Sequence, residues 1–382
     1  MSSPRVSISP SVLTWAVART ELDEEEILRR FPKLPEWLEG QTQPTLRQAR
    51  ELAHRARIPF GRLLLDEPSG EDAGVPDFRT VNNSELTAMS PDLREVVVKA
   101  QQRLAWYSEY AEEEGIEVPR VFKSADIRDT PSTSAVAARQ LMDLEQDSPI
   151  PGPDKVRNLV LWMEEAGILV SRNSIVEGST RRKLRVEEFR GFTIEDSGYC
   201  LVFINTRDSK TAQLFSLAHE LGHVLLGKPG ISDHSENLAV EHWCNRFAAE
   251  FIAPPGAVIS NHDPKKPVVD AIGPLARRFG MSREAMLWRL VELNLRSSSE
   301  AQEVLPLLRN HGQPEEKSGD GSPPHHVLVR ARVGGRFYDA VVQASNNQQI
   351  PPMAAARYLG ASSFESFRKL VNAGSAQERE AV

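Results

Sequence analysis

Residues 208–229 carry the clearest helical pattern of apolar positions in this chain. Apolar side chains recur there at the spacing of one helix face. They are Leu214, Leu217, Leu221, Val224 and Leu225. Asp208 or Ser209 can cap the start of this helix, and Gly227 followed by Pro229 ends it. The pattern therefore predicts one well-packed helix with clear signals at both ends.

Similar patterns predict helices along most of the remaining chain. Residues 9–65 favour a series of short helices, and residues 90–114 favour a long amphipathic one. Further helices are expected over residues 132–144, 155–166, 241–253, 268–279, 283–293, 353–359 and 364–371. The chain is therefore expected to be mainly helical.

Alternating or continuous short apolar runs predict strands in two places. The first group covers residues 167–170, 184–195 and 199–205, with a turn at Asp196-Ser-Gly. The second covers residues 327–333 and 337–343 near the C-terminus. We expect the first group to form a small antiparallel sheet next to the helix at 208–227.

Two histidines and a glutamate lie within that helix. His219 and His223 are four residues apart, so both imidazoles project from one face and can bind one metal ion. Glu220 lies beside them, where a carboxylate can take a proton from a metal-bound water. Taken alone, the motif could equally be two histidines on a solvated or packed helix face.

A zinc hydrolase needs a third protein ligand, and the helix predicted from residue 241 offers two glutamates. Glu241 and Glu250 are nine residues apart, about 900° of rotation, so their carboxylates point to opposite sides. Glu241 shares its face with Asn245, whose amide could hold a ligating imidazole in place. We therefore predict that Zn²⁺ binds His219, His223 and Glu241, with Glu250 as the reserve ligand.

Several separated segments together resemble one known family. The run Ala-His-Glu-Leu-Gly-His at 218–223 and the later Glu241-x-x-x-Asn245 resemble the ImmA/IrrE family of bacterial zinc metallopeptidases. Gly-Phe-Thr-Ile at 191–194 and Val-Phe-Ile-Asn at 202–205 are similar to that family's strands. The resemblance covers roughly residues 155–296.

That resemblance implies a gluzincin-like site, with zinc on His219, His223 and Glu241 and with Glu220 as the base. Members of the family cleave or inactivate repressor and regulator proteins, and many are joined to helix-turn-helix segments. The implied fold is α+β and mainly helical, with a small antiparallel sheet packed on a zincin-like helix.

The expected domains follow from these patterns and from breaks in composition. We predict a helical N-terminal domain at 1–66, a helical connecting region at 67–154 and a zinc metallopeptidase domain at 155–311. A flexible acidic joint covers 66–78. A linker at 312–324 then leads to a small α/β accessory domain at 325–382.

Two segments are candidates for binding DNA. Residues 1–66 resemble a degenerate Xre-type helix-turn-helix, because too few residues separate Phe31 and Trp37 to form a full recognition helix. We therefore favour protein contact for this segment. Residues 268–294 are the stronger candidate, as two helices joined by Gly280-Met-Ser282. Their basic residues are Arg277, Arg278, Arg283 and Arg289, and their expected packing residues are Leu287, Trp288, Leu290 and Leu293.

Composition narrows the setting in which the protein works. A net charge of −7 over 382 residues does not suggest a chain that coats nucleic acid. The two cysteines, Cys200 and Cys244, cannot form a disulfide framework and indicate a reducing compartment. No apolar run approaches the roughly 20 residues of a membrane span, and the N-terminus lacks the apolar core of a signal peptide. We expect a cytoplasmic protein with no membrane partner.

Together these features predict a zinc-dependent endopeptidase that cleaves a repressor or antitoxin-like regulatory protein in the bacterial cytoplasm. The alternative is a DNA- or toxin-binding regulator of a toxin–antitoxin pair that uses the zincin fold mainly as a scaffold. Glu220 favours the enzyme, because a structural metal needs no base beside it. The donor that stabilises the oxyanion is left open among Tyr199, His234 and His242.

Overall fold

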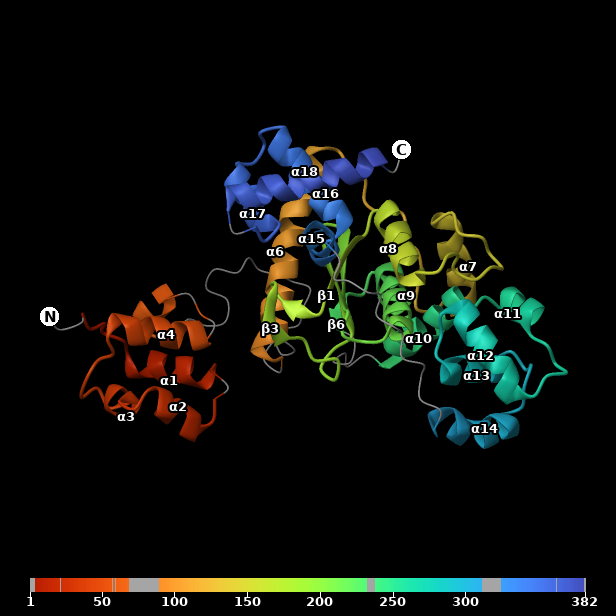
Figure 1. Ribbon diagram of the computed structural model, residues 1–382, viewed down its shortest axis with the longest axis horizontal. Helices are drawn as coiled ribbons and strands as arrows, with labels where there is room; N and C mark the ends of the chain where they lie inside the picture. The colour runs from red at the N-terminus through yellow and green to blue at the C-terminus, as the bar shows by residue number, and fades with distance from the viewer. Residues whose placement is uncertain are drawn as a thin grey trace. The chain divides into compact units, whose positions relative to one another are not determined.

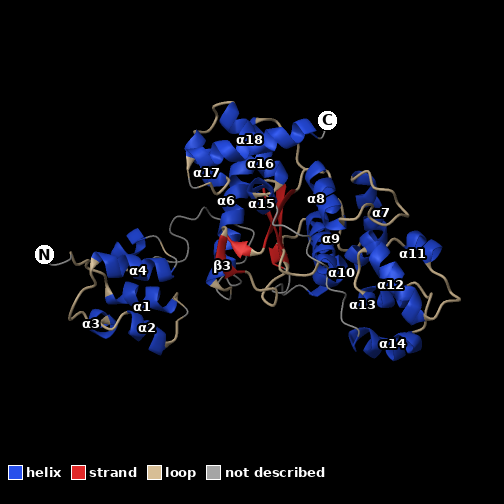
Figure 2. Ribbon diagram, in the orientation of Figure 1, coloured by secondary structure: helices blue, strands red, loops and turns tan. Residues whose placement is uncertain are grey.

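The computed structural model describes residues 4–20, 22–56, 58, 60–68, 89–231, 238–310, 324–361 and 363–380 (Figures 1 and 2). The chain forms two compact units. The first is Met1–Arg79 with Met89–Pro91, and the second is Thr80–Ala88 with Asp92–Val382. Residues 69–78 of the predicted joint and 312–323 of the predicted linker lie outside the described residues.

The first unit is a small helical bundle. Its elements are α1 (Pro10–Ala18), α2 (Glu24–Arg30), α3 (Leu34–Leu38), α4 (Leu46–Ala56) and the 3₁₀ helix η1 (Phe60–Leu64). Val12, Trp37 and Leu52 are buried at its centre. Between α2 and α4 the chain forms the five-residue α3, too short for a recognition helix. This agrees with the spacing argument from the sequence.

The second unit contains a four-stranded sheet with the order β1-β5-β4-β6. Its strands are β1 (Leu169–Asn173), β4 (Gly191–Asp196), β5 (Tyr199–Asn205) and β6 (Gly230–Ile231). A separate hairpin joins β2 (Ile175–Val176) to β3 (Ser179–Lys183). Residues 184–190 are not part of a strand, so the strand predicted from residue 184 begins at Gly191.

The sheet is mixed, and the prediction of a purely antiparallel sheet was wrong. β4 pairs antiparallel with β5 and β6, whereas β1 pairs parallel with β5. Between β1 and β5 the chain passes through the β2–β3 hairpin and β4. It enters β4 in the direction opposite to β1 and turns back into β5, so β1 and β5 run the same way. Consequently β5 lies inside the sheet with a strand on each side.

Helices cover both faces of β5, and all seven of its residues are buried. On one face, Val202 and Ile204 share a core with Leu217 and Leu221 of α9 (Lys210–Leu226). On the other face, Tyr199 packs edge-on against the ring of Tyr107 in α6 (Pro91–Glu113). The helices α8 (Lys155–Glu165) and α10 (Leu238–Ile252) pack against α9, α8 also contacts β1, and α7 (Pro131–Leu141) packs against α10.

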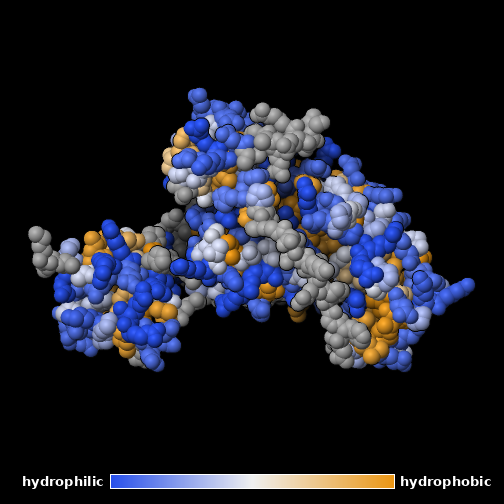
Figure 3. All heavy atoms as spheres, in the orientation of Figure 1, coloured by the Kyte–Doolittle hydropathy of each residue, from blue (hydrophilic) through white to orange (hydrophobic). Residues whose placement is uncertain are grey.

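Four helices follow α10 along the chain: α11 (Pro255–Asn261), α12 (Val268–Phe279), α13 (Arg283–Glu292) and α14 (Ser298–Asn310). Gly280 ends α12 in the left-handed conformation at φ 71°, and Ser282 caps α13, as the sequence predicted. Hydrophobic residues gather on the surface over α13 and α14 (Figure 3). Trp288 is 42% exposed there, so its expected packing role was wrong.

The C-terminal segment is helical where strands had been expected. Residues 327–333 and 337–343 lie in α15 (His325–Val333) and α16 (Gly335–Asn346), which are followed by α17 (Pro352–Tyr358) and α18 (Phe364–Glu380). Val329 and Val333 are buried four residues apart, as are Phe337 and Val341, so the same apolar runs also fit a helical period. In this helical conformation, α15 and α16 both pack against β1.

The mainly helical α+β class is therefore confirmed, with a smaller and differently paired strand content than expected. In the part of the chain that the structure describes, no helix combines the length and the apolar character needed to cross a bilayer.

Candidate metal centre

Helix α9 is a buried helix whose ends are fixed by local signals. Ser209 accepts a hydrogen bond from the backbone N–H of Ala212 at 3.2 Å, and Gly227 closes the other end at φ 57°. Three polar side chains lie in its buried middle, with exposed fractions of 6% for His219, 0% for Glu220 and 2% for His223. Buried polar groups require partners, so each of these three side chains must be satisfied by its neighbours.

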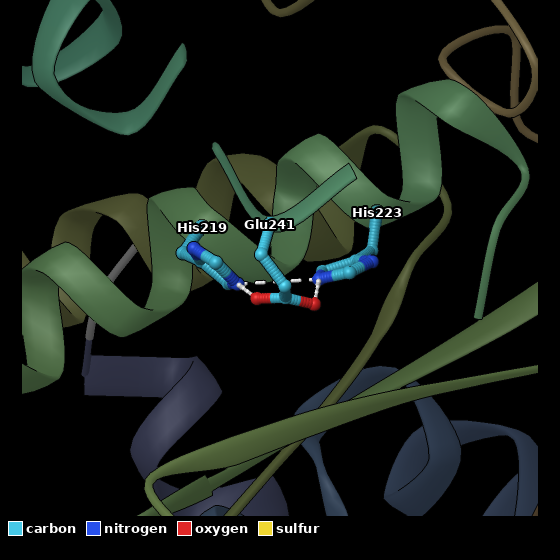
Figure 4. A group of neighbouring side chains, drawn as sticks. All are labelled: His219, His223 and Glu241. Carbon is cyan, nitrogen blue, oxygen red and sulfur yellow. Dashed lines mark hydrogen bonds and ion pairs between the residues drawn. The ribbon is translucent and has the colours of Figure 1, made fainter. Parts of the chain in front are cut away.

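The two histidines meet a carboxylate from a different helix (Figure 4). Nε2 of His219 lies 3.2 Å from Oε2 of Glu241, and Nε2 of His223 lies 3.4 Å from Oε1. The two Nε2 atoms are 3.2 Å apart. Among the described residues, this is the group of possible metal ligands whose donor atoms all fall within 4.8 Å of one another. The structure thus brings together the three ligands predicted from the sequence.

The other nitrogen of each imidazole is held by an acceptor. Nδ1 of His219 donates to Oδ1 of Asn245 at 3.0 Å, and Nδ1 of His223 donates to the carbonyl of Lys228 at 2.9 Å. A carbonyl can only accept, so this contact keeps a proton on Nδ1 and makes Nε2 the nitrogen that can bind a metal once it has no proton. Both rings are thereby oriented with Nε2 toward the cluster, which is the arrangement found in metal-binding histidines.

The cluster is also strongly coupled electrostatically. Burial opposes ionisation of Glu241, but hydrogen bonds from His219 and His223 outweigh it and hold the pKa of this carboxyl well below its usual range. Burial likewise opposes the charged form of His223, yet contacts with Cys244 and Glu241 raise its pKa well above the ordinary value. Without a metal, the site therefore attracts a positive charge, which a divalent cation would satisfy.

Glu220 points to the sheet side of α9. Thr193 of β4 donates from Oγ1 to Oε2 of Glu220 at 2.7 Å, and both side chains are buried. A Cβ on Gly191 would lie 2.9 Å from Oε1 of Glu220, so the glycine leaves room for the carboxylate. Sequence reasoning missed Thr193. Its signal was a polar residue in an otherwise apolar strand, Gly-Phe-Thr-Ile.

The reserve ligand Glu250 is engaged elsewhere. Its two oxygens accept from Nη1 and Nη2 of Arg289 at 2.9 and 2.7 Å. Arg289 is only 2% exposed and also donates to the carbonyl of Ala253. Glu250 is therefore part of a buried ion pair away from the histidines, and Arg289 is not available to contact DNA as had been considered.

None of the candidates for the oxyanion donor is shown by the described residues to reach the cluster. Tyr199 donates its hydroxyl to the carbonyl of Ile116, so it does not supply a hydrogen bond to a reacting group. His242 is exposed on α10, and His234 lies outside the described residues. Cys244 is fully buried, and burial raises the pKa of its thiol, which keeps it protonated beside His223.

The donor set fits a zinc ion. Two imidazole nitrogens and one carboxylate oxygen converge, with the ring orientations already fixed by Asn245 and Lys228. Zinc sites in hydrolases use such a set of three protein ligands. This combination is characteristic of metallopeptidases with the His-Glu-x-x-His motif.

Comparison with protein families agrees with this class. Residues 163–291 match the family model described as the IrrE N-terminal-like domain, which is a metallopeptidase family. The match supports the ImmA/IrrE family for this part of the chain. The match lies within the predicted metallopeptidase domain at 155–311 and includes β1, β4, β5, α9 and α10. A search of curated proteins finds none that matches the chain.

Proposed function

We propose that this protein is a zinc-dependent endopeptidase that cleaves a regulatory protein, of the repressor or antitoxin-like kind, in the bacterial cytoplasm. The observation that carries the proposal is the convergence of the possible ligand atoms of His219, His223 and Glu241, one residue along the helix from Glu220. In this proposal those three residues hold the ion and Glu220 is the general base.

A zinc ion in this site would polarise a peptide carbonyl and lower the pKa of a bound water from about 15.7 towards about 7. Glu220 would take a proton from the attacking water and deliver it to the leaving nitrogen. Asn245 and the carbonyl of Lys228 would keep the imidazoles in place during the reaction. Thr193 would hold Oε2 of Glu220 and so fix the position of the carboxylate.

The pairing of the sheet limits where an extended substrate can bind. β5, the strand directly before α9, is paired on both sides and offers no free edge to a peptide. An extended peptide can add only where a strand lacks a neighbour. The sheet order leaves β1 and β6 at the two ends, and α15 packs against β1. We therefore place the peptide on the β4–β6 side of the sheet.

The decisive variant is Glu220→Gln, which keeps the size of the side chain and removes its basicity. Purified wild type and E220Q would be incubated with a bacterial lysate, and newly formed protein N-termini would be identified by mass spectrometry. We expect new termini with wild type and none with E220Q, while the zinc content of both stays at one ion per chain within error.

Two outcomes would contradict the proposal. Cleavage at the same sites by E220Q would remove Glu220 from the mechanism. Full biological activity of E220Q, with zinc bound and no proteolysis, would instead support the regulator that uses the fold as a scaffold.

A further inference from the structure

A cavity of about 380 Å³ lies beside the N-terminal half of α9. Its lining comes from segments that are far apart in the sequence. They are the start of α9, the end of α10, the residue before β4 and the turn between α12 and α13 (Figure 1). Ligand pockets in proteins have volumes of about 300 to 1,000 Å³, so this cavity is at the small end and suits a single amino-acid side chain.

The cavity lies on the same face of α9 as the metal-binding histidines. Phe215 lines it and precedes His219 by four residues, which is about 400° of rotation and about 6 Å along the helix axis. Ala212 also lines it and precedes His219 by seven residues, which is about 700° of rotation. The stripe of α9 that carries the histidines therefore continues into the cavity within about two turns.

The facing helix α10 leads to the same place. Glu241, in its first turn, meets His219 and His223. Ile252, eleven residues later, lines the cavity together with Phe215. Eleven residues correspond to about 1,100° of rotation, so Glu241 and Ile252 differ by only about 20° around α10. Later residues of α10 thus lie beside earlier residues of α9, and the metal-facing sides of both helices extend to the cavity.

The start of β4 connects the cavity to Glu220. Arg190 lines the cavity and directly precedes Gly191, the first residue of β4. A Cβ on Gly191 would lie 2.9 Å from Oε1 of Glu220, so this end of β4 is next to the proposed base. A peptide held over the ion on the β4–β6 side therefore has the cavity within reach of a side chain beside the scissile bond.

The surface inside the cavity is largely apolar. Phe215, Ile252 and Met281 contribute to its lining, and the last two are only 0% and 6% exposed. The ionisable residues of the lining are Arg190 and Asp208, and Nε of the first lies 3.7 Å from Oδ2 of the second. This oxygen is buried, so a cationic substrate side chain would have to displace Arg190 to reach it. Burying a charge without a partner is costly, so the cavity favours an uncharged side chain.

The turn between α12 and α13 is fixed against α9. A Cβ on Gly280 would lie 2.7 Å from Cδ2 of Leu214, so the backbone of the turn approaches α9 closely. Ser282 accepts a hydrogen bond from the backbone N–H of Ala285 at 3.1 Å and caps α13. The helix pair that had been considered for DNA contact thus forms one side of the cavity.

We propose that this cavity is the specificity pocket of the peptidase and takes a large, uncharged apolar side chain, such as that of leucine, methionine or phenylalanine, beside the scissile bond. The inference rests on the proposed function. Phe215 and Ile252 contact the substrate side chain, and Thr211 and Ala285 limit the space available to it. A pocket of this kind selects by size, because one methylene group changes discrimination by about 10- to 200-fold.

Amino-acid hydroxamates test the pocket without requiring catalysis, because the hydroxamate chelates zinc and presents its side chain beside the ion. The hydroxamates of glycine, leucine, phenylalanine, lysine and aspartate would be titrated by calorimetry into the zinc-loaded full-length protein. Acetohydroxamate reports on the metal alone. We expect leucine and phenylalanine hydroxamates to bind at least about tenfold more tightly than the other three amino-acid probes.

Two variants fill the cavity from different sides, Ala285→Leu on α13 and Thr211→Leu on α9. Each should reduce the affinity for leucine hydroxamate at least about tenfold, to about that of glycine hydroxamate. Zinc content and acetohydroxamate affinity should stay as in wild type. The matched control is Ala137→Leu at an exposed position of α7, which should bind every probe like wild type. Circular dichroism identifies the folded variants.

The outcomes separate the pocket from the proposed function. Absence of zinc from the purified protein, or no binding of acetohydroxamate to the zinc-loaded protein, would contradict the proposed function and overturn the pocket with it. If both bind, equal affinity for glycine and leucine hydroxamates would overturn the pocket alone. Tighter binding of lysine or aspartate hydroxamate would do the same, as would an unchanged preference for leucine in either folded variant that fills the cavity.

Discussion

The two ends of α10 carry the same residue type in opposite roles. Glu241, in the first turn, faces two histidines at 3.2 and 3.4 Å. Glu250, near the last turn, is bound by both terminal nitrogens of the buried Arg289. One carboxylate meets two imidazoles that can give up a proton and bind a metal, and the other meets a permanent cation.

This difference shows how partners determine function when the side chain is the same. Arg289 is always charged, so it neutralises Glu250 and completes a structural ion pair. His219 and His223 each have their Nδ1 proton engaged elsewhere, so their remaining lone pairs need a cation from outside the chain. The first end can therefore bind a metal, and the second end can only stabilise the fold.

The largest expected effect is on metal binding. Glu241→Ala should lower the zinc content from about one ion per chain to less than about a tenth, because a site with two ligands binds zinc weakly. Mass spectrometric metal analysis of the purified protein measures this. The matched control is Glu250→Ala on the same helix, which should keep its zinc. Equal zinc loss in both variants would break the distinction between the two ends.

The next effect concerns stability at the other end. Glu250→Ala leaves Arg289 buried without its main partner and should lower the free energy of unfolding by about 3 to 5 kcal/mol. Urea unfolding of the zinc-loaded protein measures the change. The double variant E250A/R289M should recover much of the loss, because no uncompensated charge remains. A loss in the double variant as large as in E250A would show that packing, not charge pairing, is at stake.

A smaller effect is expected for the amide that orients His219. Asn245→Ala should weaken zinc binding by about 10- to 100-fold, because the Nδ1 proton loses its acceptor and the ring can turn. Competition with a chelator of known affinity measures this change. Asn245 is exposed, so the unfolding free energy of the metal-free protein should hardly change. Unaltered zinc affinity would show that the hydrogen bond to Asn245 is not needed to orient the His219 ring for zinc.

The smallest effect is a pH dependence of the zinc affinity at the Glu241 end of α10. Contacts with Cys244 and Glu241 raise the pKa of His223 against the opposing effect of burial, so in the metal-free protein a proton competes with zinc. Zinc affinity should therefore fall as the pH drops from about 8 to about 6, by about tenfold per unit for each proton displaced. Isothermal titration calorimetry in buffers of different ionisation enthalpy counts the protons released. A constant affinity over this range would contradict the raised pKa.

Much of the site could be predicted because it depends on short spacings. The four-residue separation of His219 and His223 fixes their common face, and the nine-residue separation of Glu241 and Glu250 excludes a shared one. The common face of Glu241 and Asn245 follows from the same helical geometry, whereas the hydrogen bond from His219 to Asn245 joins two helices. Thr193 escaped notice because its contact with Glu220 spans 27 residues and depends on the sheet.

The strand assignments show where such reasoning fails. The apolar runs at 327–333 and 337–343 are short enough to fit a period of 2 or of 3.6, so local pattern cannot decide between strand and helix. Packing against β1 accompanies the helical form. The parallel pairing of β1 with β5, which encloses β5 in the sheet, likewise depends on how distant segments meet.

The sequence by itself determined most of the helices before residue 324, the caps of α9 and α13, and the faces on which the metal-binding candidates lie, because these features arise from interactions within a few residues. Tertiary structure alone decided that Glu241 meets the histidines, that Arg289 occupies Glu250 and that β5 is enclosed. Those outcomes depend on which groups the folded core places opposite one another, and buried charges and unpaired strand edges require partners that no local spacing specifies.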